Sequence, residues 1–318
     1  MKRRSVLKLV GLACPASGAF AQTFSGRSGR LVVPLGAGTL SDYVARLVAP
    51  TIGTGMNMSL VVENKAGANG VIGVQDVMRS APDGRTLLLG SASPLAINMA
   101  LVKNLPYDPR RDLTPITGAY VTQHVVVVKA SHPARTFSDF IAYAKERPGR
   151  VGIGSSSTLV KAQILAINKM AGIELLDVPY KATGPTFTDV LGGILDAAFT
   201  DMVTAKAQEK GGQVRILAVS SLKRNPMAPD WPAISETLPG FDFSSWSALV
   251  GPQGMQPDVV SQIARSYAEA MKQKDVVDKL EQAGILPWTT TPEELKAHIE
   301  VQTAKWIKLG RELNIQPE

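Results

Sequence analysis

The protein has 318 residues, of which 45% are hydrophobic, with 34 lysines and arginines against 27 aspartates and glutamates. A chain of this length can bury a large core and usually forms two domains. Four of the seven net positive charges lie on Lys2, Arg3, Arg4 and Lys8, which leaves the rest of the chain near +3. The sequence contains neither a long basic run nor a basic stripe with interleaved aromatic residues, so we expect no nucleic-acid partner.

The first 21 residues have the features of an export signal. A charged start is followed by a mostly apolar run, 6–20, that is too short to span a bilayer, and Ala19-Phe20-Ala21 fits the small-x-small cleavage pattern. The Arg3-Arg4 pair also fits the twin-arginine route, so an ordinary secretory signal and a twin-arginine signal both stay open. We therefore expect a periplasmic protein that begins after Ala21.

Cysteine and histidine are scarce. The single cysteine, Cys14, lies inside the signal and follows a poor lipidation sequence, so the exported chain has no thiol. This excludes disulfides, thiolate zinc sites and a cysteine nucleophile. Because His124, His132 and His298 are not at metal-ligand spacing, we expect them to pack or to lie on the surface, and we expect no metal and no cofactor.

Short apolar runs alternate with helical patterns in the first part of the exported chain. Strands are expected at 31–33, 60–62 and 86–89, with helices between them at about 41–52 and at 71–79. Strand, helix, strand, helix in short order predicts an α/β domain with parallel pairing.

The same alternation starts again after residue 120. Strands are expected at 125–128 and 151–153, helices at 137–145 and about 158–170, and further elements at 189–195, 197–200 and 216–219. The second α/β unit ends near residue 240, and a helical tail follows. Its helices are expected at 257–272, at 275–283 and from 292 onward.

The last helix is well marked in the sequence. Thr291 can cap it, Pro292 suits its first turn, and Glu294 completes a capping box. Trp306 lies on the apolar face of this helix, so we expect it to be a core residue.

Three loops rich in glycine and hydroxyl side chains each follow an expected strand and precede a helical segment. They are Gly36-Ala37-Gly38-Thr39, Gly90-Ser91-Ala92-Ser93 and Gly154-Ser155-Ser156-Ser157. In parallel α/β domains such loops lie at one edge of the sheet, where ligands bind. Helix N-termini there offer unpaired N–H groups and a partial positive charge, which suits an anion. Each loop alone is consistent with a plain connection, but the three together predict an anion held between two domains.

A dinucleotide-dependent enzyme is the main alternative. Gly36-x-Gly38-x-x-Ser41 follows a strand and opens a helix, and Glu63 supplies an acid after the next strand, as in the Rossmann fingerprint. Against this, Ser41 replaces the third glycine, and Pro34-Leu35 intervenes where the turn should be tightest. An exported nicotinamide- or flavin-dependent oxidoreductase therefore stays open as the alternative function.

Hydrolytic chemistry has less support. The sequence has no Gly-x-Ser-x-Gly elbow, and no histidine is placed as a partner for Ser91 or Ser155. Asp189, Asp196 and Asp201 could serve acid–base chemistry, but hydrogen bonding at a helix surface or hinge is the more common role of such residues. We expect no catalytic residue.

Six short motifs follow one another along the exported chain. They are LVVPLGAGTLSD at 31–42, VENKAGANG at 62–70, APDGRTLLLG at 81–90, LPYDP at 105–109, VPYKATGP at 178–185 and DVLGG at 189–193. In order and spacing they resemble the Bug family, the extracytoplasmic solute receptors of tripartite tricarboxylate transporters. The first two are similar to that family's VVPFPAGGxxD and VENRPGAGG, and the similarity covers essentially the whole exported chain.

The resemblance implies an α/β, two-lobed periplasmic binding protein of the Venus-flytrap, type II-like class. Two crossover segments, near 122–128 and 244–250, would join the lobes, and a helical C-terminal tail would complete the chain. One lobe would comprise 22–123 and 247–318, the other 124–246. Family members capture small carboxylates (di- and tricarboxylates, amino acids, aromatic acids) and deliver them to membrane transporter subunits, so the resemblance implies a monomeric receptor and no enzyme.

Position by position, the resemblance implies ligand contacts on both sides of a cleft. The first lobe would contribute Leu35, Gly36, Ala37, Gly38, Thr39 and Ser41, with Ser91, Ser93 and Asn98 as a second wall. The opposite lobe would contribute Ser155, Ser156, Ser157, Thr158, Thr200 and Asp201. Family members typically grip one carboxylate through the first loop and ordered waters, without an arginine.

Two departures from the family pattern bear on specificity. The family's Phe-Pro-Ala-Gly-Gly is Leu35-Gly36-Ala37-Gly38-Thr39 here, so the loop lacks its proline and has more backbone freedom. The family's GSSGNGSSxHL is shortened by about two residues to 154–160 and has lost its histidine, while Lys161 stands close by. Lys161 either pairs with a second ligand carboxylate or is a solvated helix lysine.

Overall fold

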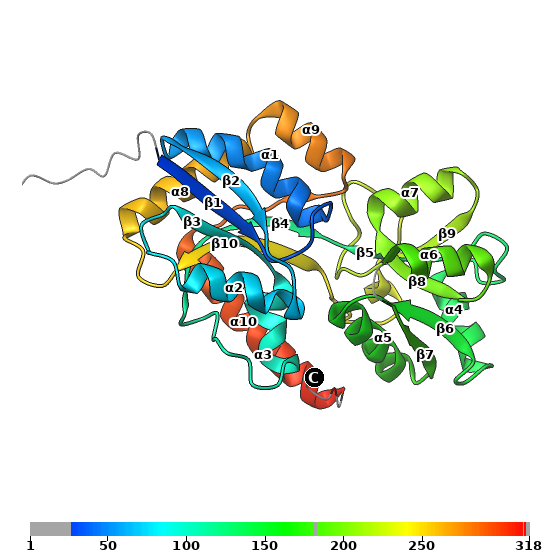
Figure 1. The fold of residues 1–318 in the computed structure, drawn as a ribbon. Coiled ribbons are helices and arrows are strands. Elements are labelled where there is room, and N and C mark those ends of the chain that lie inside the picture. Colours follow the sequence, from blue (N-terminus) through cyan, green and yellow to red (C-terminus); the bar gives the residue numbers. More distant parts are fainter. Residues whose placement is uncertain (1–26, 181–182, 314, 316–318) are drawn as a thin grey trace, which may run out of the picture.

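The computed structural model describes residues 27–180, 183–313 and 315. They form two α/β lobes, each built around one β-sheet (Figure 1). The predicted export signal, residues 1–21 with Cys14, lies outside the described residues. In the part of the chain that is described, no helix is both long and apolar enough to span a membrane.

The first lobe contains a six-stranded sheet in the order β11-β4-β10-β3-β1-β2. Its strands are β1 (Arg27–Val33), β2 (Met58–Asn64), β3 (Thr86–Ser91), β4 (Leu113–Thr122), β10 (Ser245–Pro252) and β11 (Leu286–Pro287). β1 runs parallel to β2 and β3, which confirms the predicted pairing. β10 runs antiparallel to β3 and β4, and β11 runs antiparallel to β4, so the sheet is mixed.

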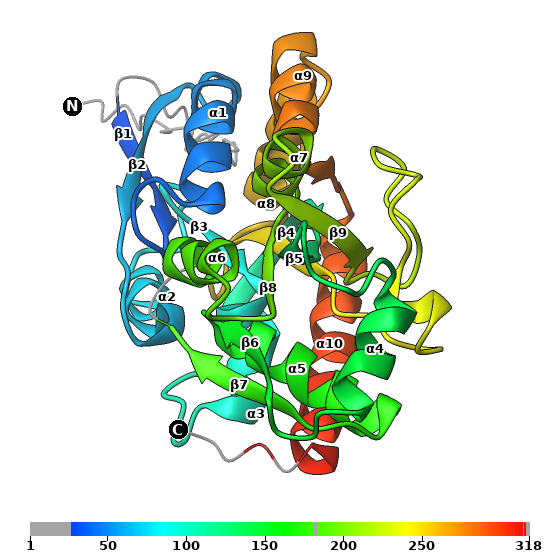
Figure 2. The same ribbon diagram turned by 90° about the vertical axis from the view of Figure 1, so that its right-hand side faces the viewer.

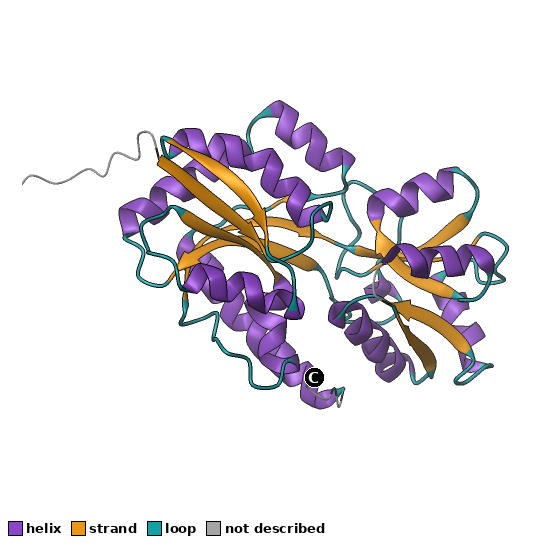
Figure 3. Ribbon diagram, in the orientation of Figure 1, coloured by secondary structure: helices purple, strands orange, loops and turns teal. Residues whose placement is uncertain are grey.

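Helices cover both faces of the first sheet (Figure 3). They are α1 (Leu40–Gly55), α2 (Val71–Met78), α3 (Asn98–Leu101), α8 (Pro257–Ala270), α9 (Lys274–Gln282) and α10 (Pro292–Glu312), with the short turns η1 (Ala68–Gly70) and η2 (Ser93–Ile97). Strand side chains alternate between the two faces. Leu31 and Val33 therefore pack in one core with α1 and α8, whereas Val32 packs in another with α2 and α10.

The second lobe contains a five-stranded sheet in the order β7-β6-β8-β5-β9. Its elements are β5 (His124–Lys129), α4 (Phe137–Lys145), β6 (Val151–Ser155), α5 (Thr158–Ala171), β7 (Leu175–Pro179), α6 (Thr183–Gly192), β8 (Ala197–Asp201), α7 (Met202–Lys210), β9 (Val214–Val219) and η3 (Ile234–Glu236). β6 is parallel to β7 and β8, and β5 is antiparallel to β8 and β9. The element expected at 189–195 is in fact α6, which begins earlier because Pro185 is tolerated in a first helical turn.

The chain passes between the sheets twice, first through Gln123 alone and then through segment 220–244. β4 ends at Thr122 and β5 begins at His124, while β10, which starts at Ser245, already pairs with β4 in the first sheet. Most of the predicted crossover segments, 122–128 and 244–250, belongs to strands β5 and β10 of the two sheets. The crossings themselves therefore lie next to these strands and not within them.

Buried amides hold these crossings. The Nδ2 of Asn225 donates to Oε1 of Gln123 at 3.1 Å. Oε1 of Gln163 lies 3.2 Å from Nδ1 of His124, and Nε2 of Gln163 donates to the carbonyl of Phe243 at 3.2 Å. Gln123, Gln163 and Asn225 are buried, so the polar groups at the hinge satisfy one another.

We expect stability to depend on pH through the three histidines. Burial lowers the pKa of His124, His132 and His298 below the ordinary 6.5, so their folded forms are neutral at pH 7. Stability is fully present above pH 6.5 and falls as the pH drops below it, because the unfolded chain then binds more protons. We expect the melting temperature to fall between pH 7.5 and 5.5, with a loss of up to about 1.4 kcal/mol per pH unit for each histidine. His124→Gln should flatten this dependence, whereas a melting temperature that rises towards pH 5.5 would contradict it.

The C-terminal helix α10 connects both lobes. Its start confirms the predicted capping box, since Thr291 accepts from the backbone of Glu294 and Glu294 binds back to Thr291. Trp306 is 3% exposed and packs edge-on against Phe243 at a ring-centroid distance of 5.7 Å. Nζ of Lys305 donates to the carbonyl of Asp242 at 2.7 Å. Trp306 is therefore a core residue, as predicted.

Candidate functional site

The first predicted loop connects β1 to α1. Thr39 caps α1 by accepting from the backbone of Asp42, and its hydroxyl donates to the carbonyl of Gly36 at 2.8 Å. The N–H of Gly38, a residue with φ of +79°, donates to Oδ2 of Asp42 at 2.9 Å. The N–H groups of Gly36 and Ala37 donate to no described residue. These two groups, beside the positive end of α1, are available to an anion.

Asp42 holds the first loop in place, a role that the sequence analysis missed. The interaction with Arg46, whose NH2 lies 2.9 Å from Asp42 Oδ1 in an ion pair, outweighs burial and keeps the pKa of the Asp42 carboxyl below its ordinary value, so it is ionised at neutral pH. This carboxylate already occupies the N–H of Gly38. The signal was available in the sequence, because Asp42 stands in the third position of the helix and four residues after Gly38.

Four of the predicted first-lobe contacts differ in how deeply they are buried. Ser41 is 3% exposed, and its hydroxyl is hydrogen-bonded to the hydroxyl of Tyr120 at 2.7 Å. Ser91 ends β3 and Ser93 begins η2, and both are half-buried. Asn98 is 2% exposed, and its Nδ2 donates to the carbonyl of Asn69 at 3.0 Å. The interior hydrogen bonds of Ser41 and Asn98 support the neighbouring backbone.

The second-lobe loop connects β6 to α5. Ser157 caps α5 by accepting from the N–H of Val160, and the carbonyl of Ser155 accepts from the N–H of Tyr180 at 2.7 Å. The first-turn N–H groups of Thr158 and Leu159 donate to no described residue. This loop therefore presents hydroxyls and helix-terminal N–H groups, as the first loop does.

A cavity of about 490 Å³ lies between the lobes at this second loop. Ser155, Ser156, Ser157, Thr158 and Lys161 line it from the second lobe. The residues that complete it were not predicted: Asn69 and Leu101 from the first lobe, Asp177, Pro179 and Tyr180 from the second, and Ile315 near the C-terminus. No arginine is among the described residues around it, and Lys161 and Asp177 contribute one charge of each sign.

The structure brings only part of the predicted set into this cavity. The predicted residues that do not line it are Leu35, Gly36, Ala37, Gly38, Thr39, Ser41, Ser91, Ser93, Asn98, Thr200 and Asp201. Asp201 caps α7, since its Oδ1 accepts from the N–H of Thr204 at 2.8 Å. Asp189 binds the hydroxyl of Tyr180, and Asp196 accepts from the N–H of Gly152 at 2.8 Å. The three aspartates thus have structural hydrogen bonds.

Asn69 reaches the cavity because its loop is bent and anchored. Ala68 and Asn69 have φ of +46° and +52°, between Gly67 and Gly70 at +131° and +89°. Asn and Gly adopt this left-handed region most readily. The Asn69-Gly70 pair was therefore the signal, within the VENKAGANG motif, that could have placed a turn here.

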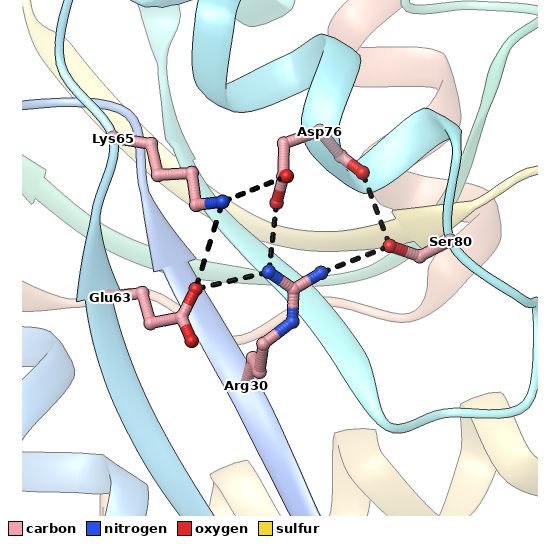
Figure 4. Close-up of polar contacts among 5 residues, drawn as sticks. All are labelled: Arg30, Glu63, Lys65, Asp76 and Ser80. Carbon is pink, nitrogen blue, oxygen red and sulfur yellow. Dashed lines mark hydrogen bonds and ion pairs between the residues drawn. The ribbon is translucent and has the colours of Figure 1, made fainter.

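A charged cluster fixes the start of that loop (Figure 4). Nζ of Lys65 lies 2.8 Å from Oδ1 of Asp76, and NH1 of Arg30 lies 3.0 Å from both Asp76 Oδ2 and Glu63 Oε2. Burial raises the pKa of Asp76, but the bond from Lys65 and the charge of Arg30 outweigh it, so the pKa lies below its ordinary value. Glu63, the acid of the Rossmann-like pattern, is thus used to join β2 to β1 and α2.

The Thr200 hydroxyl leads to a prediction about stability. Its hydroxyl is buried and has no hydrogen-bond partner among the described residues. Because an unpaired buried hydroxyl costs about 1–3 kcal/mol, we expect Thr200→Val to raise the free energy of unfolding by about 1 kcal/mol. Chemical denaturation measures this change.

Thr117→Val is the matched control for that variant. The Thr117 hydroxyl is buried too, but it donates to the carbonyl of Thr290 at 2.9 Å and accepts from the Thr290 N–H at 3.1 Å. Its replacement should lower the free energy of unfolding by about 1–3 kcal/mol. A destabilised Thr200→Val variant would show that the hydroxyl has a partner after all.

Two lobes joined by two crossings, with hydroxyl-rich loops at the ends of their parallel strands, are the architecture of a two-lobed solute-binding protein. Comparison with known proteins agrees. Residues 44–315 match the model of the tripartite tricarboxylate transporter family receptor, and the chain belongs to this family. It is 32% identical to Protein BugT of Bordetella pertussis over 306 residues, which cover 95% of this chain and 93% of BugT.

Two solved structures extend the comparison. Rpa4515 of R. palustris, solved with adipate, is 28% identical with a TM-score of 0.82, covering 92% of this chain and 99% of that one. MatC of Rhodopseudomonas palustris, solved with bound malate, is 25% identical with a TM-score of 0.76, covering 89% and 99%. The family consists of solute-binding receptors of the periplasm, and the comparisons give no support to the oxidoreductase alternative.

Proposed function

We propose that the protein captures a small carboxylate between its lobes and delivers it to the membrane subunits of a tripartite tricarboxylate transporter. The observation that carries this is that each lobe has a strand-to-helix loop, 35–39 in the first and 155–158 in the second, that offers N–H groups and hydroxyls. The relatives solved with adipate and with malate support a carboxylate as the ligand.

The ligand-binding residues that we propose are those of the two loops and the walls beside them. They are Leu35, Gly36, Ala37, Gly38, Thr39, Ser41, Ser91, Ser93, Asn98, Ser155, Ser156, Ser157, Thr158, Thr200 and Asp201. Ser41 and Asn98 would act from within, by holding the backbone that faces the ligand. The proposed lobes are 22–123 with 247–318, and 124–246, in a monomer exported behind its signal and without catalytic activity.

Binding follows from charge-assisted hydrogen bonds. Each such bond to a carboxylate contributes about 1.5–3 kcal/mol. After the costs of ordering and closure, a micromolar affinity of about −8 kcal/mol is a reasonable total. Closure excludes water and strengthens these bonds, and it makes the closed form the one that a transporter recognises.

A thermal-shift series tests the proposal. Malate, adipate, citrate and amino acids are added separately to the purified protein, followed by mass spectrometry of each mixture. We expect one or a few carboxylates to stabilise the fold, by about 2.7 kcal/mol at a hundred times the dissociation constant, and to be recovered unchanged. Turnover of the stabilising compound, or no response to any carboxylate at millimolar concentration, would contradict the proposal.

A further inference from the structure

A second groove between the lobes lies away from the 155–158 loop. It has a volume of about 610 Å³, and its walls are α7 and segment 227–231 of the second lobe and the end of α9 with Gly284 of the first. α7 and α9 both lie on the upper side of the molecule in the two ribbon views (Figures 1 and 2). The groove is thus built by both lobes.

The groove is apolar inside, with two lysines on its α7 wall and Glu281 on the opposite wall at the end of α9. Met202 forms part of its wall, Val203 is 41% exposed, and Met227 and Trp231 line the same space. Lys206 and Lys210 stand one turn apart on α7, and neither forms an ion pair with a described residue. Exposed apolar surface next to two lysines that form no ion pair with a described residue is typical of a protein-binding site whose partner brings carboxylates to that wall.

The shape of the groove depends on the angle between the lobes. α7 begins directly after Asp201, one of the proposed ligand contacts. On the opposite wall, Gly284 has φ of +65°, and a Cβ placed on it would lie 3.0 Å from the Cβ of Met202. The lobes therefore touch at this point, and a rotation that closes the cleft on a ligand must change the groove.

We propose that this groove docks a periplasmic segment of the transporter's membrane subunits, through an apolar side chain flanked by carboxylates. The inference rests on the proposed function and deepens it, because it names the surface that delivers the solute. The apolar side chain enters beside Val203 and Trp231, and the carboxylates pair with Lys206 and Lys210. Because both lobes form the groove, the partner distinguishes the loaded receptor from the empty one.

Charge reversal tests the docking surface. Two groove variants are compared with the wild type in two assays. One is the double variant Lys206→Glu/Lys210→Glu, and the other is Val203→Glu. The first assay is calorimetric binding of malate and adipate. The second is uptake of the same radiolabelled probes by proteoliposomes that contain tripartite tricarboxylate transporter membrane subunits. Lys145→Glu/Lys296→Glu is the control, because it makes the same charge change at exposed lysines on α4 and α10.

We expect both groove variants to bind the probe within twofold of the wild type and to support at least tenfold less uptake, while the control keeps both. Uptake equal to the wild type in both groove variants would overturn the docking site, and so would a parallel loss of binding and uptake. If the wild type binds neither probe and supports no uptake, the proposed function itself is contradicted. The wild-type measurements alone give this result, so it is distinguishable from failure of the docking site.

Discussion

Gly38→Val is expected to lose the stabilising response to carboxylates, with at least a hundredfold loss of affinity, while the protein stays folded. Gly38 has φ of +79°, a conformation that a β-branched residue adopts only with strain. No atom lies within 4 Å of an added Cβ, so the strain comes from the backbone and not from a steric clash. The loop relieves it by moving, which displaces the N–H groups of Gly36 and Ala37.

The size of this effect follows from the bonds that are lost. Two charge-assisted hydrogen bonds together contribute about 3–6 kcal/mol, and a hundredfold change in affinity is about 2.7 kcal/mol. The thermal shift and calorimetric titration with the best carboxylate measure it.

Gly240→Val is the matched control for Gly38→Val. Gly240 also has a positive φ, +88°, and open space around a Cβ, but it lies in the second lobe between η3 and β10. We expect a similar loss of stability, of about 1–2 kcal/mol, with the ligand response intact. If both variants respond to the ligand as the wild type does, the first loop is not part of the site.

Trp306→Ala is expected to lower the free energy of unfolding by about 3–5 kcal/mol. The indole is buried, packs edge-on against Phe243 and belongs to the core that both lobes share through α10. Its removal leaves a cavity that the rigid aromatic neighbours cannot fill. Denaturant titration followed by circular dichroism measures the loss.

Val301→Ala, on the same helix, separates packing from helix propensity. Val301 is 63% exposed, so its replacement should change the free energy of unfolding by no more than about 0.5 kcal/mol. If Trp306→Ala is no more destabilising than Val301→Ala, then the packing of Trp306 against Phe243 does not stabilise the fold as described.

Local patterns predicted the parts of the fold that depend on local structure. The β1–α1–β2 unit and the capped α10 follow from alternation, helical spacing and side-chain capping, which act over a few residues. The antiparallel insertion of β10 between β3 and β4 was not predictable in this way. It pairs Leu249 with Leu89, and its register is set by packing between segments far apart in the chain.

The candidate site was also predictable only in the features that depend on local sequence. Residue types predicted which loops would carry hydroxyls and free N–H groups, but not which side chains would turn inward. Ser41 and Asn98 look like ligand contacts in the sequence, yet their partners Tyr120 and Asn69 are 79 and 29 residues away and hold them inside the first lobe. Such burial depends on tertiary packing, which no local pattern records.

The most direct test of the central claim is a crystal structure with the carboxylate that gives the largest thermal shift. We predict one carboxylate group within hydrogen-bonding distance of the N–H groups of Gly36 and Ala37, and the remainder of the ligand against 155–158 of the closing lobe. A carboxylate bound outside the space between these two loops, or one held only by side chains of a single lobe, would contradict the account.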